Sequence, residues 1–502
     1  MRFLFSRTVI MRRATPILFV AILCLGLLLP LLPLATNPLH PDEALYAYWA
    51  ALIASGRDAM LNTVPVDKPP LFIYALALWF KGMGISSAAA RLLSLAAHLA
   101  SIGLTFGLGR TLYNSRTGLL AAFLLAGSPF SILFAPTALT DPMMVAWVLS
   151  AALAAAGGRP GWAGLGLGLA AASKQQGVFF VPLILGLLIV SRRGKQAGRA
   201  TAVCLLVFAA SLLAPLVWDA ARTRRPGFWL QSSLSYGPLD VGVGQFPQRL
   251  AGFFNLLKLA AASPALNVIF AAGLPLLLAL GVWGPAQMRG RRADRLLAGF
   301  CLLFVLLHAA ATFQIWDRYL LGLVPLLALL LARILHLPAA LIELRAGPTG
   351  IRQVATLLAA ALAAALMVYP VRQAVNSRYP IGGDHGAFYG VAETAAYLRG
   401  HAGANVTLYH HQLGTHWRFY LLGFPYDFRF WQSAQDLGRQ AAANAGGVQY
   451  AAFPAWQSTT LVELTLQDRG LTLEPVFKTF APDGSPAVYL YQIVPLTQTR
   501  AE

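Results

Sequence analysis

Carboxylates and a lysine gather in two short stretches near the start of the chain. His40-Pro41-Asp42-Glu43 follows the first long apolar run, and Asp67-Lys68-Pro69-Pro70 opens another apolar segment. A carboxylate can take a proton from a hydroxyl group, and a lysine can neutralise a phosphate. Charges at a membrane surface are costly unless they are used or solvated. We therefore expect a polar site here, with two ordinary exposed loops as the alternative.

Two further polar groups are expected at the same surface, Thr140-Asp141-Pro142 and Lys174-Gln175-Gln176. Asp141 precedes an apolar run, so it could cap that helix, take part in the site, or do both. Lys174 could extend from a helix end toward water, but its place in a very short turn with two glutamines favours a polar site. An anionic lipid headgroup would suit these residues, because soluble nucleotide sugars are not expected outside a bacterial membrane.

The composition is that of an integral membrane protein. Of the 502 residues, 57% are hydrophobic and 11% are charged, whereas soluble proteins carry about 25% charged residues. The net charge of +19 comes mainly from basic residues between apolar runs, and no basic module indicates nucleic-acid binding. Cys24, Cys204 and Cys301 lie in apolar runs, so we expect them to pack as small hydrophobic side chains.

The apolar runs predict about eleven membrane spans, with the N-terminus in the cytoplasm and the C-terminus outside. The first run, 14–35, follows four arginines and is longer than a typical signal-peptide core, so we prefer a retained anchor to a cleaved signal. Segments 42–55 and 69–83 are predicted as helices at the outer surface. The other predicted spans are 86–109, 117–134, 140–156, 161–174, 177–190, 200–218, 264–285, 296–313, 318–336 and 352–369.

One predicted external loop, 219–262, departs from the positive-inside pattern. Long loops escape that rule more easily than short ones, but the departure could also be functional. The basic residues concerned are Arg222, Arg224, Arg225 and Arg249.

The composition changes after Arg372, so we divide the chain into a membrane domain, 1–370, and a small extracytoplasmic α/β domain, 371–502. No nucleotide-binding motif is present in the tail. His410, His411 and His416 are expected to pack or be solvated, because no carboxylate completes a familiar metal-ligand spacing. The predicted strands are 406–409, 448–451 and 487–491, and the predicted helices are 390–400 and 433–445.

Across residues 1–340 these motifs form an ordered set that resembles a known family. The set comprises Asp42-Glu43 with Tyr46, Asp67-Lys68-Pro69-Pro70-Leu71, Arg91, Thr140-Asp141-Pro142, Lys174 and Arg318-Tyr319-Leu320-Leu321. It resembles the GT-C class of glycosyltransferases that use polyprenyl-phosphate sugars, in the branch of the protein mannosyltransferases and the lipid A aminoarabinose transferase. The resemblance implies a polytopic all-α membrane protein of GT-C type with a C-terminal soluble α/β domain.

The resemblance also implies an inverting sugar transfer. Asp42 inherits the role of general base, and Glu43 would orient it or contact the acceptor. Lys68 inherits the contact with the lipid phosphate, aided by Lys174 or Arg318. The remaining expected substrate-binding residues are Tyr46, Asp67 and Asp141.

The implied partners are a polyprenyl-phosphate sugar donor, a lipid, glycan or protein acceptor, and the lipids of the inner (plasma) membrane. Asp67 stands where the aminoarabinose branch often has Glu, so the sugar stays open. No cofactor is identified, and a divalent metal ion is left open.

Two other classes of protein stay open at this point. A transporter would place polar residues near the bilayer midplane and often contains a repeat, whereas the charges here lie at the ends of spans and no repeat is visible. A lipid-binding or glycan-binding assembly protein without catalysis would also fit an outer α/β domain.

Overall fold

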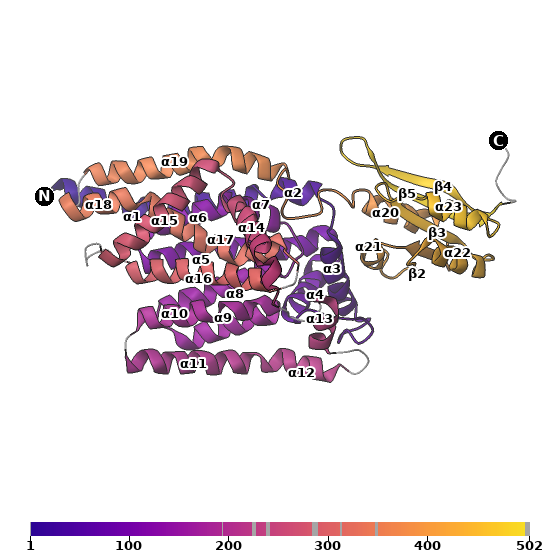
Figure 1. Ribbon diagram of the computed structural model, residues 1–502, viewed down its shortest axis with the longest axis horizontal. Coiled ribbons are helices and arrows are strands. Elements are labelled where there is room, and N and C mark those ends of the chain that lie inside the picture. The colour runs from indigo at the N-terminus through magenta and orange to yellow at the C-terminus, as the bar shows by residue number, and fades with distance from the viewer. Residues whose placement is uncertain are drawn as a thin grey trace. The chain divides into compact units, whose positions relative to one another are not determined.

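The computed structural model describes residues 2–192, 194–222, 227–236, 241–283, 290–311, 314–346 and 350–496 (Figure 1). The chain forms two compact units. The first comprises Met1–Ala35 and Ile53–Gly382, and the second comprises Thr36–Leu52 and Gly383–Glu502. Arg224 and Arg225 lie outside the described residues.

The first unit is helical. Its α-helices are α1 Arg2–Leu28, α2 Leu31–Thr36, α4 Leu71–Met83, α5 Ser87–Leu112, α6 Ser115–Gly127, α7 Pro129–Phe134, α8 Asp141–Ala156, α9 Pro160–Ser173, α10 Val181–Ser191, α11 Lys195–Ser211, α12 Leu213–Ala221, α13 Phe228–Tyr236, α14 Phe246–Leu257, α15 Pro264–Trp283, α16 Arg291–Ala310, α17 Val324–Leu335, α18 Leu337–Ala346 and α19 Gly350–Val375. Its 3₁₀-helices are η1 Gln175–Phe180, η2 Val243–Gln245, η3 Lys258–Ala260 and η4 Asp317–Leu323.

Within the described residues, seven helices are long and apolar enough to cross a membrane, fewer than the eleven runs predicted. The four other predicted runs form shorter helices. Run 117–134 is divided at Ser128 before Pro129, Lys174 separates 161–174 from 177–190, and 140–156 forms the 16-residue helix α8. A proline cannot donate the hydrogen bond that would continue a helix. The seven long helices are Thr15–Thr36, Ser87–Leu112, Lys195–Ala221, Pro264–Trp283, Arg291–Ala310, Asp317–Leu335 and Gln353–Val375.

Glycines bring the short helix α9 close to its neighbours. A Cβ atom at Gly164 would collide with the Cys204 carbonyl oxygen of α11, and one at Gly168 would collide with the Ser211 side chain. Small residues at helix contacts are the usual means of close packing in a membrane. The tight packing of α9 fixes the position of Lys174, which follows its last residue.

The second unit contains a five-stranded mixed sheet, in the order β2-β1-β3-β5-β4. Strand β1 runs parallel to β2 and β3, and β5 runs antiparallel to β3 and β4. The strands are β1 Thr407–His410, β2 Asp427–Phe430, β3 Gln449–Pro454, β4 Leu471–Phe480 and β5 Pro486–Pro495, and the helices are α3 Pro41–Ala54, α20 Val391–His401, α21 Gly414–Tyr420, α22 Ala434–Ala443 and α23 Thr460–Gln467.

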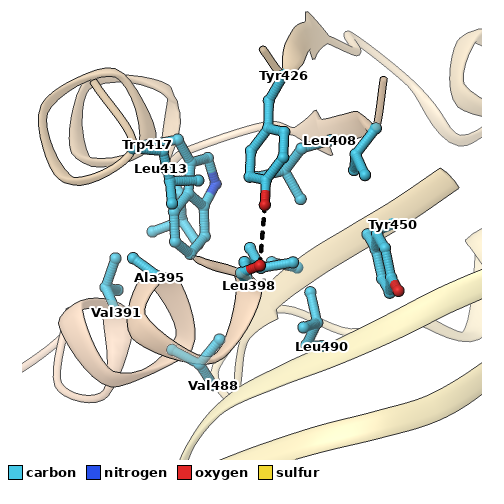
Figure 2. Packing of buried hydrophobic residues seen from close by; sticks show 13 residues of the cluster. Val391, Ala395, Leu398, Leu408, Leu413, Trp417, Tyr426, Tyr450, Val488 and Leu490 are labelled. Atoms are coloured by element: carbon cyan, nitrogen blue, oxygen red, sulfur yellow. Dashed lines mark hydrogen bonds between the residues drawn. The ribbon is translucent and has the colours of Figure 1, made fainter. Parts of the chain in front are cut away.

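Apolar side chains fill both faces of this sheet. One cluster packs Leu408 and Leu490 of the sheet against Trp417 and Leu398, and the Tyr426 hydroxyl donates a 2.8 Å hydrogen bond to the Leu398 carbonyl oxygen (Figure 2). A second cluster includes Phe453, Leu437 and Leu466. Each predicted strand and helix of the tail is present, whereas β2, β4, α21 and α23 were not predicted.

The missed strands β2 and β4 lie at the two edges of the sheet and expose many of their side chains. They therefore lack the continuous apolar run that identifies a buried strand. The predicted fold class, a helical membrane protein with a C-terminal α/β domain, is confirmed. Residues 36–52, predicted within the membrane domain, belong to the C-terminal unit. Helix α19 continues to Val375, beyond the predicted boundary at 370.

Candidate functional site

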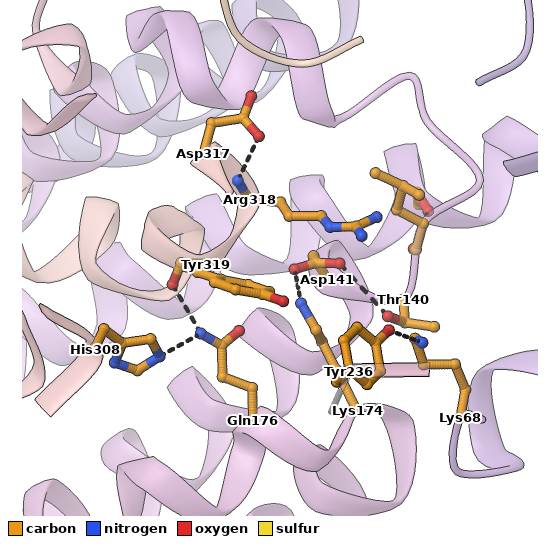
Figure 3. A network of polar contacts seen from close by, with 12 residues as sticks. Lys68, Thr140, Asp141, Lys174, Gln176, Tyr236, His308, Asp317, Arg318 and Tyr319 are labelled. Atoms are coloured by element: carbon orange, nitrogen blue, oxygen red, sulfur yellow. Dashed lines mark hydrogen bonds and ion pairs between the residues drawn. The ribbon is translucent and has the colours of Figure 1, made fainter. Parts of the chain in front are cut away.

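A buried ion pair between Asp141 and Lys174 lies at the centre of a polar network in the first unit (Figure 3). Lys174 Nζ lies 2.5 Å from Asp141 Oδ1, and both side chains are almost fully buried. Thr140, not Asp141, occupies the N-cap position of α8 and makes no side-chain cap bond. Asp141 is therefore the counterion of Lys174, and Lys174 does not extend into water.

Lys68 forms a second charged pair. Its Nζ lies 2.7 Å from Asp67 Oδ2, and it also bonds to the Tyr236 hydroxyl of α13. The ring of Tyr236 lies under the ammonium group, 4.8 Å from its centroid. Lys68 is 4% exposed, so its charge is held by a carboxylate, a hydroxyl and an aromatic ring. The Tyr236 contact joins residues 168 positions apart, and no local pattern predicts it.

The backbone of Asp67 is held in place by two further side chains. Gln175 Nε2 donates to the Asp67 carbonyl oxygen at 2.6 Å, and the Ser232 hydroxyl donates to the same oxygen at 3.1 Å. Gln175 Nε2 also donates to Ser232 at 2.8 Å. Because Gln175 directly follows Lys174, these bonds tie the two lysine-bearing segments together.

Arg318 is the third buried cation of the network. Figure 3 shows its side chain extending toward Asp141, and both Arg318 and Lys68 lie close enough to repel the Lys174 ammonium group. Asp317 faces the backbone instead. Its carboxylate accepts from the Arg318 N–H at 2.7 Å and from the Gly382 N–H at 2.8 Å.

Gln176 and His308 extend the network next to Lys174. Gln176 Nε2 lies 3.1 Å from His308 Nε2 and donates to the Tyr319 carbonyl oxygen at 3.0 Å. The Tyr319 ring lies beneath Lys174, 4.9 Å from the ammonium nitrogen. His308 and Tyr319 thus hold the turn that carries Lys174. Nothing in the sequence around His308 indicates this role.

Two arginines of the predicted external loop are buried and bind backbone carbonyl groups. Arg222 donates to Leu61 and Val64 at 2.9 Å and 3.0 Å, in the segment that leads to Asp67. Arg249 donates to the carbonyl oxygen of Ala309 at 3.0 Å, at the end of α16. Arg222 and Arg249, which depart from the positive-inside pattern, therefore both have structural roles.

Asp58 completes the support of the segment before Asp67. It accepts from the Asn62 N–H at 2.9 Å and from the Thr63 N–H and hydroxyl at 2.7 Å and 2.6 Å. These hydrogen bonds lower the pKa of Asp58 although its burial acts the other way. Asp58 and Arg222 thus both hold the turn that precedes Asp67.

Asp42, Glu43 and Tyr46 lie on α3 and belong to the second unit. His40 occupies the N-cap position, since its carbonyl oxygen accepts from the Ala44 N–H at 3.0 Å. Glu43 accepts from the His40 N–H at 3.1 Å, as in a capping box. Glu43 is buried and Asp42 is partly exposed. Glu43 therefore has a structural role, and Asp42 is the more accessible carboxylate.

The site residues of the first unit combine three buried cations with two carboxylates: Lys68, Lys174 and Arg318 with Asp67 and Asp141. Buried cations are costly unless they are paired. An excess of positive charge in such a place suits an anion that carries several acceptor oxygens. Arg91, another residue of the predicted set, is also buried, in α5.

Comparison with known proteins gives a family match for part of the first unit. Residues 67–218 match the family model of the dolichyl-phosphate-mannose-protein mannosyltransferases. This range includes the Asp67-Lys68 pair, Asp141 and Lys174. No match was found among curated proteins.

Solved structures share the fold over most of the chain. ArnT from Cupriavidus metallidurans bound to undecaprenyl phosphate has 14% identity and a TM-score of 0.62, covering 94% of this chain and 97% of that chain. Its apo form gives 15% identity and a TM-score of 0.67, covering 95% and 98%. The oligosaccharyltransferase of Archaeoglobus fulgidus has 12% identity and a TM-score of 0.51, covering 94% and 74%. The chain therefore has the fold of the GT-C glycosyltransferases, and the resemblance predicted from its motifs is confirmed.

Proposed function

We propose that this protein is a membrane glycosyltransferase that moves a sugar from a polyprenyl-phosphate donor to an acceptor hydroxyl group, with inversion, at the outer face of the inner (plasma) membrane. The buried group of Lys68, Lys174 and Arg318 carries the proposal. A leaving phosphate is stabilised by cations that are already in place before the reaction. The structure of ArnT with bound undecaprenyl phosphate supports a lipid-linked donor.

The proposed reaction is a single displacement. The acceptor oxygen forms a bond to the anomeric carbon of the sugar, and the bond between that carbon and the phosphate oxygen breaks. The polyprenyl phosphate leaves with the electron pair, and Lys68 binds its charge with help from Lys174 or Arg318. Asp42 takes the proton of the acceptor hydroxyl as general base.

The other carboxylates have supporting roles in this proposal. Asp141 and Asp67 hold Lys174 and Lys68 in position until the donor arrives. Glu43 holds the first turn of α3 through the His40 N–H and so orients the neighbouring Asp42. Tyr46, buried one turn further along α3, completes the packing around that turn.

Mass spectrometry of envelope lipids and glycans from cells with and without the gene would identify the product. We expect one lipid or glycan class to lose a sugar in the deletion strain. The purified protein should then transfer that sugar from its polyprenyl-phosphate donor. An unchanged envelope together with no transfer in vitro would contradict the proposal.

The proposed orientation has its own test. A reporter fused after residue 375 should be active only outside the cytoplasm, because the predicted spans place the C-terminal unit there. Cytoplasmic activity of the reporter would reverse the orientation and move the site to the other face.

A further inference from the structure

The C-terminal unit holds the segment that precedes Asp42. His416 of α21 is 1% exposed. Its Nε2–H donates a 2.8 Å hydrogen bond to the Leu39 carbonyl oxygen. Residues 36–52 accordingly form one compact unit with the C-terminal domain. The start of α3 is thus positioned by a domain that begins more than three hundred residues later in the sequence.

A second contact to this segment comes from the loop 383–390. Asp384 lies within electrostatic range of both His40 and Glu43. Its Oδ1 accepts from the Gly386 N–H at 3.1 Å. Its Oδ2 is buried and has no hydrogen-bond partner among the described residues. Burial and the charge of Glu43 act together to raise the pKa of Asp384.

Three residues of the loop 383–390 have positive φ values. His385, Gly386 and Gly390 have φ values of +55°, +86° and +78°. Residues with a side chain rarely adopt such φ values, whereas glycine adopts them without strain. A buried carboxylate oxygen without a partner is uncommon in a folded protein and needs an explanation.

Aromatic side chains lie on and against the same loop. The Phe388 ring stacks on His416 at 4.8 Å, and the Trp456 ring meets Phe388 edge-on at 6.3 Å. The Trp456 Nε1–H donates to the Ala387 carbonyl oxygen at 2.9 Å, which fixes the indole against the loop. Trp456 nevertheless remains 54% exposed.

This combination matches the chemistry of a sugar ring. The C–H face of a pyranose packs on an exposed indole, while its hydroxyl groups donate to carboxylate oxygens. We propose that the loop 383–390, with Asp384 and Trp456, is a subsite for a pyranose ring of the acceptor, next to the start of α3. The proposal rests on the proposed glycosyl transfer and assigns the C-terminal unit the recognition of the acceptor.

The test uses the full-length purified protein. The acceptor probe is the envelope extract of the deletion strain, titrated at a fixed concentration of donor. Asp384→Asn should raise the apparent KM for the extract about tenfold, as expected for loss of a hydrogen bond to a charged group. Trp456→Ala should also raise it about tenfold, because the sugar loses the aromatic face on which it packs. Binding of undecaprenyl phosphate should stay within about twofold of the unaltered protein. Trp456→Phe should recover most of the loss.

Asp436→Asn serves as the matched control, because Asp436 is a partly exposed carboxylate of the same unit, in helix α22. Its apparent KM should equal that of the unaltered protein. An unchanged apparent KM in both Asp384→Asn and Trp456→Ala would overturn the subsite. A raised KM in the Asp436→Asn control as well would also overturn it, since the effect would then be one of general charge.

A direct measurement separates this proposal from the proposed function. In saturation-transfer NMR with methyl pyranosides at millimolar concentration, the signal should weaken in Trp456→Ala and return in Trp456→Phe. If the unaltered protein transfers no sugar but this pattern holds, the glycosyl transfer fails and the sugar subsite stands. Equal signals in the unaltered protein and Trp456→Ala would overturn the subsite whatever the activity.

Discussion

The two units of the protein differ in the burial of their ion pairs. In the first unit the ion pairs are buried: Lys174 with Asp141 at 2.5 Å and Arg333 with Asp294 at 3.0 Å. In the second unit the ion pairs are exposed, as for Arg439 with Asp436. Exposed pairs contribute about 0–1 kcal/mol, whereas breaking a buried pair costs about 3–5 kcal/mol.

Both units also bury histidines: His98, His308 and His336 in the first unit, and His410 and His416 in the second. In the second unit, both ring nitrogens of His410 lack a hydrogen bond among the described residues. We expect the stability of the first unit to depend on its buried ion pairs, and that of the second unit on the protonation state of His410 and His416. The predictions below test these two dependences, in order of expected size.

Asp42→Asn should abolish transfer while the protein stays folded in the membrane. Asn keeps the shape of Asp but cannot accept a proton at neutral pH, and loss of a general base costs about 10²–10⁴-fold in rate. His40, not Asp42, is the N-cap residue of α3, so the helix should tolerate the change. Transfer by purified protein, with melting temperature as control, measures this. Near-normal turnover would refute the role of Asp42.

Lys174→Met alone should destabilise the first unit by about 3–5 kcal/mol, because it leaves the buried Asp141 carboxylate without its partner. The double variant Asp141→Leu with Lys174→Met should recover most of the stability but none of the activity. Arg439→Ala, at an exposed pair of the second unit, should change stability by less than about 1 kcal/mol. Recovery of activity in the double variant would make the pair purely structural.

Acid should weaken the second unit through its buried histidines. Burial lowers the pKa of His410 and of His416 to about 4, from an ordinary value of 6.5. Their contribution is complete above pH 6.5 and is lost as pH falls from 6.5 toward 4, at about 1.4 kcal/mol per pH unit for each histidine. Melting curves between pH 7 and pH 4 measure this loss.

A His416→Gln variant provides the control, because its amide can still donate to the Leu39 carbonyl oxygen. It should lose about half of the acid sensitivity. The titratable or charged groups near His416 are His40 and Glu43, and those near His410 are Arg418 and His411. A pH dependence that is the same in the variant would show that other groups control acid stability.

Lys68→Ala should weaken donor use by about tenfold, far more than Arg57→Ala. Both residues precede α4, but Lys68 is buried against Asp67 and Tyr236 whereas Arg57 is exposed. Binding of undecaprenyl phosphate to purified protein compares them directly. Equal effects would indicate general electrostatic attraction and not a specific site.

Many helices of the first unit were predictable, because helices that lie in lipid are composed almost entirely of apolar residues. Long apolar runs identify membrane helices, and Lys68, Asp141 and Lys174 are conspicuous as charges between such runs. The strands β1, β3 and β5 were also predictable, since their apolar residues form continuous runs. The close glycine packing of α9 against α11 was not evident from the residues alone.

The sequence by itself determined that this is a membrane protein with charged side chains between its apolar helices, because transfer of charge into lipid is costly at any position. Only the tertiary structure decided the partner of each charge. Lys174 pairs with Asp141, 33 positions away, Lys68 bonds to Tyr236, 168 positions away, and His416 bonds to Leu39, 377 positions away. Such contacts depend on how helices and loops pack against one another, and no local pattern of residues predicts that packing.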